Sequence, residues 1–390
     1  MFDEVALSPG LQHNSRTDSI EGFVDYGGSN RRLAFADHAL TFMLKGIHKK
    51  WKQTVCFTFC EGTTSTDQLA SILTEVVRHV RKCGLQRVAT ISDQGATNQA
   101  AINRLIADTN KYFAEQEREN SIQGYLIDGI EIVHLFYFPH LMKCIRNMLL
   151  NKDLHFVQQG KRKVASWSHV MRLYQLDNSR GAYSFVKLTD EHVIPEKIRK
   201  MKVKNCTQVF SHTVGTAMHV AARISSELTP ESEFYLTPKA VHTADLLLFF
   251  DKLFDSVNGS AHLLSPGKNL RSVVTQKSEH VVTITSGGDV TGCDLTPVEH
   301  SGVSKPPCLK NWVFSLRGLI YLTPKLFSAN LTKFAPRCFN QDPVENFFSC
   351  IRSYGFRNTN PTCSSFITSC KSLILCRHIP RVQIVNQTNR

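Results

Sequence analysis

The sequence has no CxxC pair, although its twelve cysteines are scattered from Cys56 to Cys376. A structural zinc site needs ligands at such paired spacing, so the pattern argues against a site of this kind. No secretory feature supports disulfide bonds either. We therefore expect mostly buried free thiols in a reducing compartment.

The sequence also lacks a long apolar run. Its longest runs resemble Leu246-Leu247-Leu248-Phe249-Phe250, whereas a membrane-spanning helix needs about 20 apolar residues. The opening MFDEVALSPG has acids where a signal peptide needs basic and then apolar residues. Low-complexity tracts and repeats of fixed period are absent as well. We expect a soluble, intracellular protein.

Acidic residues are in the minority, with 33 Asp and Glu against 46 Lys and Arg and a net charge of +13. Such an excess favours a polyanionic partner, although a solvated basic surface would give the same count. Because the basic residues are clustered, nucleic acid is the preferred interpretation. The clusters are Lys45, Lys49, Lys50 and Lys52; Lys161, Arg162 and Lys163; and Lys197, Arg199, Lys200, Lys202 and Lys204.

The first 150 residues predict strands alternating with helices. Residues near 2–7, 20–25 and 54–60 are typical of strands, and an amphipathic helix from about Leu69 to Val80 ends at Gly84. The remaining predicted elements are a strand at 87–91, a helix near 98–107, a strand at 130–136 and a helix from Pro139. This order predicts an α/β fold with a mixed sheet, and it is also the order of an RNase H-like core.

The composition and the predicted secondary structure change after residue 150. The stretch 151–337 is richer in helix signals, and 257–310 is rich enough in Gly, Ser, Pro and Thr to predict a long loop. A helix is then predicted at 342–353, with Asp342 as its cap and Pro343 in its first turn. Glu345 lies at the edge of the apolar stripe of this helix.

Three acids have the positions that metal-assisted phosphodiester cleavage requires. Asp3 lies on the first strand, Asp93 follows the strand 87–91, and Glu345 lies on the late helix. Carboxylates at strand ends and on an adjoining helix can hold Mg²⁺, which prefers oxygen ligands. Each acid has a plainer explanation. Asp3 can be a solvated strand residue, Asp93 can form an Asx turn, and Asp342 with Glu345 has capping-box spacing.

The chain resembles the P-element-type transposases, including their THAP domain-containing relatives. Six blocks in the family's order carry the resemblance, which runs from about residue 2 to residue 370. The blocks are FDEVALSPGLQHNSRTDSIEGFVDYG, SDQGATNQAAINRL, FPHLMKCIRN, KMKVKNCTQVFSHTV, TADLLLFFDKLFDSVN and QDPVENFFSCIRSYGFRNTNP.

This resemblance implies an RNase H-like mixed-sheet core interrupted by a mostly α-helical GTP-binding insertion. The core would take in 1–150 and 338–390, and the insertion 151–337. The family cuts DNA at transposon ends and joins the 3′ ends to a target. Its three catalytic, metal-binding acids correspond here to Asp3, Asp93 and Glu345.

The resemblance also implies a guanine nucleotide site. The sequence contains no generic GxxxxGK[ST] motif that would predict a nucleotide independently. Lysines neutralise phosphates, an aromatic ring can stack on a base, and an Asp can accept from guanine. Asp251 is a rival for the Asp of this site, and core packing is the alternative for its aromatic residue. The implied contacts are Lys187, Lys202, Val203, Ser211, Phe254, Asp255 and Asp342.

The chain departs from the family pattern in two respects. Tyr137 stands where the family usually has an Asp before its PHLLK-like block, and the zinc-coordinating THAP domain and dimerising segment are missing ahead of Asp3. We expect specific recognition of transposon ends to be absent or weak. His140, Lys143 and Arg146 have helical spacing that suits phosphate contacts or an exposed basic face.

The leading hypothesis is a Mg²⁺- or Mn²⁺-dependent DDE-type DNA transposase with GTP as an organising ligand. The resemblance further implies nuclear localisation and a homo-oligomer in active complexes with DNA. The main alternative is a domesticated, non-catalytic DNA- and GTP-binding protein. A third hypothesis, an unrelated RNase H-like nuclease, is disfavoured by the long insertion.

Overall fold

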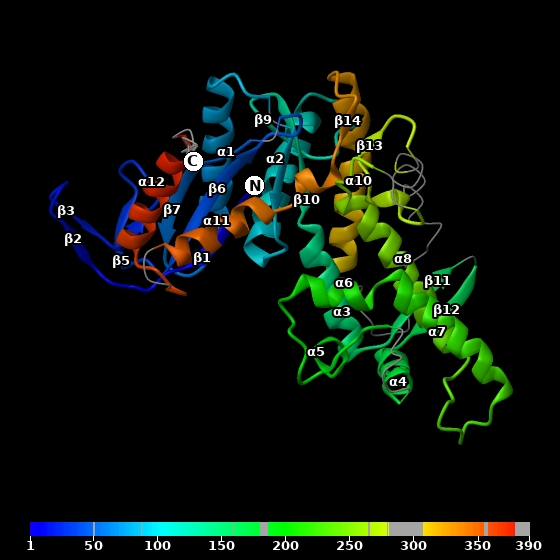
Figure 1. The fold of residues 1–390 in the computed structure, drawn as a ribbon. Coiled ribbons are helices and arrows are strands. Elements are labelled where there is room, and N and C mark those ends of the chain that lie inside the picture. Colours follow the sequence, from blue (N-terminus) through cyan, green and yellow to red (C-terminus); the bar gives the residue numbers. More distant parts are fainter. Residues whose placement is uncertain are drawn as a thin grey trace, which may run out of the picture. The chain divides into compact units, whose positions relative to one another are not determined.

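The structure is a computed structural model, and contacts within it divide the chain into two compact units (Figure 1). Unit 1 consists of Met1–Lys111, Ile127–Gly129 and Gln341–Arg390, and unit 2 of Tyr112–Leu126 and Ile130–Asn340. The residues described are 1–49, 51–86, 88–158, 160–179, 186–263, 266–278, 280, 307–354 and 358–378.

Unit 1 contains an antiparallel sheet with the strand order β1-β6-β7-β4-β5. The predicted strands near 2–7 and 54–60 are confirmed as β1 and β7. The predicted strand 20–25 is two strands, interrupted at Gly22, where φ is +120° and a Cβ would lie 2.0 Å from the Gly10 oxygen. The strands are β1 (Phe2–Ala6), β4 (Phe23–Asp25), β5 (Arg31–Phe35), β6 (His38–Lys45) and β7 (Lys52–Cys60), with a separate hairpin of β2 (Gln12–Asn14) and β3 (Ser19–Glu21).

One face of this sheet is covered by two C-terminal helices, α11 (Asp342–Ser353) and α12 (Cys363–His378), orange to red in Figure 1. Val5, on β1, belongs to the same buried cluster as Val344 and Phe347 of α11. Side chains alternate between the two faces of a strand, so Asp3 points to the same face as Val5. The sheet therefore presents Asp3 toward the helix that carries Glu345.

The region that follows the sheet in sequence contains α1 (Thr66–Lys82), β8 (Ala89–Ser92) and α2 (Ala96–Glu115). The Ser65 hydroxyl accepts a hydrogen bond from the Gln68 N–H at the start of α1, and Gly84, at φ +74°, follows its end. The predicted strand 87–91 is observed as β8, while Arg87 lies outside the described residues. β8 lies beside β1 and leads directly into Asp93.

Helix α11 matches the predicted range, but the capping-box interpretation is wrong. The N-cap is Gln341, Asp342 is already helical, and no side chain caps the helix. The Gln341 amide instead donates to the Phe2 carbonyl oxygen over 2.7 Å. The Glu345 N–H is already satisfied by the Gln341 carbonyl oxygen at 3.1 Å. The side chains of Asp342 and Glu345 are therefore not needed as caps.

Unit 2 is mostly helical, as predicted. Its helix α3 contacts α6, α8 and α10 and so lies centrally in the unit. The predicted loop 257–310 is too long at both ends, because one helix continues to Asn258 and another begins at Pro307. Between them the described residues contain two short elements, η2 (Asn269–Arg271) and β13 (Val274–Thr275), and 281–306 lies outside the described residues. The helices are α3 (Phe138–Asn151), α4 (Trp167–Asn178), α5 (Asp190–Val193), α6 (Val203–Val209), α7 (His212–Ile224), η1 (Ser225–Glu227), α8 (Ala240–Asn258), η2 (Asn269–Arg271), α10 (Pro307–Ser328) and η4 (Pro336–Phe339).

The strands of unit 2 belong to small sheets of two or three strands. Strand β10 is covered by α10 at close range, because Gly318 of α10 has no side chain and a Cβ there would lie 2.9 Å from Leu135. The Phe136 N–H donates to the Ser315 hydroxyl of α10 over 2.9 Å, which satisfies a buried strand amide. β9 (Tyr125–Ile127) lies next to β10 (Ile130–Phe136) in a three-stranded sheet, and the two-stranded sheets are β11 (Leu154–Gln158) with β12 (Lys161–Ala165) and β13 (Val274–Thr275) with β14 (Lys333–Phe334).

Helix α3 corrects the interpretation of its basic residues. Arg146 is fully buried and Lys143 nearly so, and only His140 is partly accessible. The Arg146 guanidinium donates to the Lys200 carbonyl oxygen over 2.5 Å. Helical spacing placed these residues on one face, but Lys143 and Arg146 are packed inside unit 2, so these two residues do not form an exposed basic surface.

The cysteines follow the prediction in part. All ten whose side chains the structure describes are free, as predicted, but only five of them, including Cys206 and Cys363, are buried. Burial raises the pKa of Cys363 to about 11, which keeps its thiol protonated near neutral pH. None of the helices in the described ranges has the length and apolar character needed to cross a lipid bilayer.

Candidate functional site

The three acids predicted from the sequence all belong to unit 1. Asp3 lies in β1, opposite Thr41 of β6, and Asp93 directly follows β8. Glu345 lies in the first turn of α11, which contacts β1. Three separate parts of the chain thus carry the acids to neighbouring elements of one unit.

Burial and neighbouring charges act on the carboxyl group of Asp3. Burial raises the pKa of the Asp3 carboxyl to about 7, and the negative charges of Asp93 and Glu345 add to this shift. The Glu4 N–H, which donates to Asp3 Oδ1 over 2.9 Å, acts in the opposite direction. Repulsion of this kind is expected where acids gather at one place.

Asp93 forms the turn that the plainer interpretation predicts. Its Oδ1 accepts from the Gly95 N–H at 2.9 Å and from the Asn98 side-chain amide at 2.6 Å. A Cβ on residue 95 would lie 3.1 Å from the same oxygen, so the glycine makes room for it. The turn and the electrostatic coupling to Asp3 therefore occur together, and the turn fixes the direction of the carboxylate.

The acids suit a divalent cation in chemical type, because Mg²⁺ and Mn²⁺ prefer carboxylate oxygens. A cation would also relieve the repulsion that raises the pKa of Asp3. Within the described ranges, however, no group of three or more His, Cys, Asp or Glu side chains is placed to hold a metal ion. The acids are coupled electrostatically but do not form a ready-made coordination sphere.

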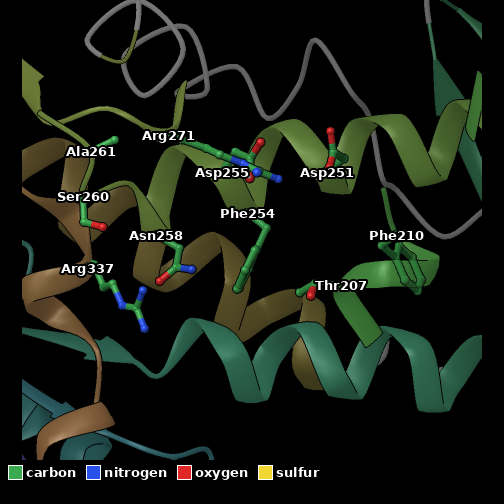
Figure 2. A pocket seen from close by; sticks show the side chains of 10 residues that line it. All are labelled: Thr207, Phe210, Asp251, Phe254, Asp255, Asn258, Ser260, Ala261, Arg271 and Arg337. Carbon is green, nitrogen blue, oxygen red and sulfur yellow. Dashed lines mark hydrogen bonds and ion pairs between the residues drawn. The ribbon is translucent and has the colours of Figure 1, made fainter. Parts of the chain in front are cut away.

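Unit 2 contains a pocket of about 370 Å³ (Figure 2). Two of the predicted nucleotide contacts, Phe254 and Asp255 of α8, line it, and so does the rival acid Asp251. Figure 2 places Phe210 and Arg337 at opposite ends of the pocket. The remaining lining residues are Thr207, Asn258, Ser260, Ala261 and Arg271.

The two acids of the pocket are held by cations from the segment after α8. Asp255 pairs with Arg271 at 2.9 Å and with Lys268 at 3.1 Å, and Lys268 also pairs with Asp251 at 2.6 Å. The side chains of Asp251 and Asp255 are only 8% and 11% exposed. These pairs fix both carboxylates at the pocket wall, where either can accept hydrogen bonds from a ligand.

The other predicted nucleotide contacts do not line this pocket, although most lie around α6. Lys202 is the N-cap of α6 and Val203 its first residue, while Ser211 caps the next helix, α7. The carbonyl oxygen of Lys187, a residue at φ +49°, accepts from the Gln208 side chain of α6 over 2.6 Å. Asp342 belongs to unit 1, where it is the first residue of α11.

Most of the residues that line the pocket were not predicted from the sequence. Asn258 could have been predicted, because it is the Asn of the FDxxN pattern that places Phe254 and Asp255. Arg271 and Arg337 belong to no motif and come from segments well separated from α8 in the sequence. Only the folded unit brings them to one cavity.

Tyr137 is the N-cap residue of α3 and is 2% exposed. Its ring lies 5.0 Å from that of His140, measured between centroids. A buried aromatic ring therefore occupies the position at which an Asp was expected, and it supplies no carboxylate there.

Three family models match successive parts of the chain. The TNP-like RNase H N-terminal domain matches residues 1–106, the TNP-like GTP-binding insertion domain 139–268, and the TNP-like RNase H C-terminal domain 338–369. The chain belongs to the TNP-like, P-element-type transposase family. This family's arrangement, two RNase H parts separated by an insertion, is the one predicted from the sequence blocks.

A relative within the family is the transposable element P transposase of Drosophila melanogaster. It is 23% identical over 371 residues, which cover 93% of this chain and 43% of the relative. The chain thus spans less than half the length of that protein. No THAP domain is among the matched parts of this chain.

The solved structure of the Drosophila P element transposase strand transfer complex shares the fold. Its TM-score is 0.72 at 22% identity, over 97% of this chain and 76% of the solved chain. The prediction of an RNase H-like α/β core interrupted by a mostly helical insertion is therefore confirmed.

Proposed function

We propose that this chain is the catalytic region of a P-element-like DNA transposase that performs metal-dependent DNA cleavage and strand transfer. Asp3, Asp93 and Glu345 are its catalytic acids. The observation that carries this proposal is that β1, which holds Asp3, lies beside both β8, which leads into Asp93, and α11, which carries Glu345. The family assignment supports it, because the relative's name describes a transposase.

Asp3, Asp93 and Glu345 would hold Mg²⁺ or Mn²⁺. When bound, such ions activate the attacking water or 3′-hydroxyl and neutralise charge on the leaving oxygen. The protein's own groups orient the acids. The Glu4 N–H holds Asp3, the Gly95 N–H and the Asn98 amide hold Asp93, and the backbone of α11 holds Glu345. No side chain needs to become covalently attached to DNA.

The pocket of unit 2 is proposed to bind GTP. Phe254 can stack on the guanine base, and Asp255, fixed by Arg271, can accept from its N1–H and exocyclic amine. The family resemblance assigns Lys187 and Lys202 to the phosphates and adds Val203, Ser211 and Asp342 as contacts, although none of these five residues lines the pocket. The predicted domains, 1–150, 151–337 and 338–390, belong to the same proposal.

Transposon-end and target DNA are the proposed partners, with homo-oligomeric complexes in the nucleus. The net charge of +13 supports a polyanionic partner. The relative with the solved fold is described in a strand transfer complex, which is consistent with DNA.

A second candidate is a domesticated, non-catalytic DNA- and GTP-binding protein. Two observations favour it. Tyr137 is buried where the family usually has an Asp, and no group of acids within the described ranges is placed to hold a metal ion.

A nicking assay on transposon-end DNA separates the two functions. The intact chain should cleave in Mg²⁺ or Mn²⁺ but not in EDTA, and Glu345→Ala should reduce the rate at least a hundredfold. Glu75→Ala, which removes an exposed acid of α1 in the same unit, is the matched control and should cleave like the intact chain. Absence of metal-dependent cleavage, or equal cleavage by Glu345→Ala, would favour the non-catalytic function.

A further inference from the structure

A pair of consecutive side chains, Asn340 and Gln341, stands at the point where the chain passes from unit 2 to unit 1. Asn340 is 1% exposed, and its amide donates to the side-chain oxygen of Asn258 over 2.6 Å. Gln341 is fully buried, and its amide donates to the carbonyl oxygen of Phe2 over 2.7 Å. One peptide bond thus joins a side chain bonded in unit 2 to a side chain bonded in unit 1.

The unit 2 end of this link is a residue of the pocket. Asn258 lines the cavity together with Arg337, which lies three residues before Asn340 in the same short segment (Figure 2). The Arg337 N–H donates to the Gly259 carbonyl oxygen over 3.2 Å, and the Asn340 N–H donates to the Arg337 carbonyl oxygen over 3.2 Å. The segment is therefore fixed to the pocket wall by its backbone as well as by the Asn340 side chain.

The unit 1 end of the link reaches the residue beside a proposed catalytic acid. Phe2, whose carbonyl oxygen Gln341 holds, is covalently joined to Asp3. A displacement of the Gln341 side chain would move the Phe2–Asp3 peptide and, with it, the carboxylate of Asp3.

Each of the two amides carries a free-energy cost to the stability of the fold. The side-chain oxygens of Asn340 and Gln341 are buried with no hydrogen-bond partner in the described part of the structure. A buried, unsatisfied oxygen costs free energy, but an apolar residue of the same size would leave the Asn258 and Phe2 oxygens without these donors. The two amides are therefore explained by the hydrogen bonds that they donate, one in each unit.

We propose that Asn340 and Gln341 are positioning residues that couple occupancy of the unit 2 pocket to the position of Asp3. A nucleotide that contacts Asn258 changes the orientation or rigidity of its amide, and the Asn340 side chain, which is hydrogen-bonded to that amide, moves with it. Gln341, the next residue, then transmits the movement to the Phe2 carbonyl through its own hydrogen bond. The inference rests on the proposed function in that the pocket ligand is a guanine nucleotide and Asp3 serves catalysis.

Amide hydrogen exchange of β1 in the full chain, with and without GTP, tests this coupling. GTP binding is measured in parallel by calorimetric titration. In the intact chain, saturating GTP should slow exchange in residues 2–6 at least threefold. Asn340→Leu and Gln341→Met remove one donor each at similar volume. Both should still bind GTP within about fivefold of the intact chain, but they should lose the slowing in β1.

The matched control is Gln175→Met, the same substitution at an exposed position of α4 in unit 2. It should keep both GTP binding and the slowing in β1. If either apolar variant fails to fold, Asn340→Asp or Gln341→Glu removes the same donor while the residue stays polar.

Each outcome bears on the coupling. Equal slowing in the variants and the intact chain would overturn it. GTP binding without any change in β1 of the intact chain would also overturn it while leaving the nucleotide site in place, whatever the variants do. A titration that finds no GTP binding would remove the proposed nucleotide function, and the coupling with it.

Discussion

The carboxylate of Asp93 lies close enough to Asp3 for its negative charge to raise the pKa of the Asp3 carboxyl. Asp3 comes from the first strand of unit 1, and Asp93 follows the strand beside it. Glu345, from a helix near the end of the chain, acts on Asp3 in the same direction. The three acids therefore act on one another's neighbourhood from three separate parts of the chain.

Replacing Asp3 with Asn should change stability in a pH-dependent manner. The pKa of Asp3 is about 7 in the folded protein and about 4 in an unfolded chain. Between these values the folded state binds the additional proton, so the metal-free protein loses stability as the pH rises from about 4 to about 7. Asp3→Asn removes this loss and should raise the melting temperature in EDTA by several degrees at pH 8, but hardly at pH 4.

The check is calorimetric melting of both proteins in EDTA at the two pH values, followed by Mg²⁺ addition at pH 8. Mg²⁺ should raise the melting temperature of the intact chain more than that of Asp3→Asn. An equal difference between the proteins at pH 4 and pH 8 would show that the ionisation of Asp3 does not affect stability.

Removing the Asn98 amide should weaken catalysis without removing an acid. Asn98 donates to Asp93 Oδ1 over 2.6 Å and so directs the carboxylate. Asn98→Ala should lower the rate of metal-dependent nicking by roughly 10–100-fold, in line with the loss of an outer-shell partner of a metal ligand. Asn103→Ala, at an exposed position of the same helix, should cleave like the intact chain. Equal nicking rates for the two variants would show that the orientation of the Asp93 carboxylate does not affect cleavage.

The two acids of the pocket should differ in their effect on GTP binding. If Asp255 accepts hydrogen bonds from the guanine base, Asp255→Asn should weaken GTP binding by roughly 10–100-fold, as expected for a lost hydrogen bond to a charged group. It should also reduce the preference for GTP over ATP. Asp251→Asn leaves the pair between Asp255 and Arg271 intact and should cost less. Calorimetric titration of both variants with GTP and ATP measures these losses of affinity. A larger loss in Asp251→Asn than in Asp255→Asn would assign base recognition to Asp251.

The elements that carry the site were predictable because their signals are local. β1 and β7 are rich in β-forming residues, and α11 begins at an Asp-Pro pair followed by an apolar stripe. Strand β6, which lies between β1 and β7 in the sheet, was not predicted. Its residues His38–Lys45 form an almost continuous buried run without the alternation of a half-exposed strand.

The parts that failed depend on tertiary packing. Helical spacing places Lys143 and Arg146 on one face, but it cannot show that this face is buried. The pattern around Asp342 and Glu345 suited a cap, yet Gln341 occupies the cap position and bonds to Phe2. Arg271 and Arg337 reach the pocket through long-range folding that leaves no local pattern.

Direct binding of Mn²⁺ to unmodified and substituted chains tests the central claim, that Asp3, Asp93 and Glu345 together hold the metal. Isothermal titration near pH 8, where Asp3 is mostly ionised, measures the affinity of the intact chain, Asp93→Asn, Glu345→Gln and the exposed control Glu75→Gln. The account predicts that the two site variants each bind at least tenfold more weakly, whereas Glu75→Gln binds like the intact chain. Unchanged Mn²⁺ affinity in both site variants would contradict it.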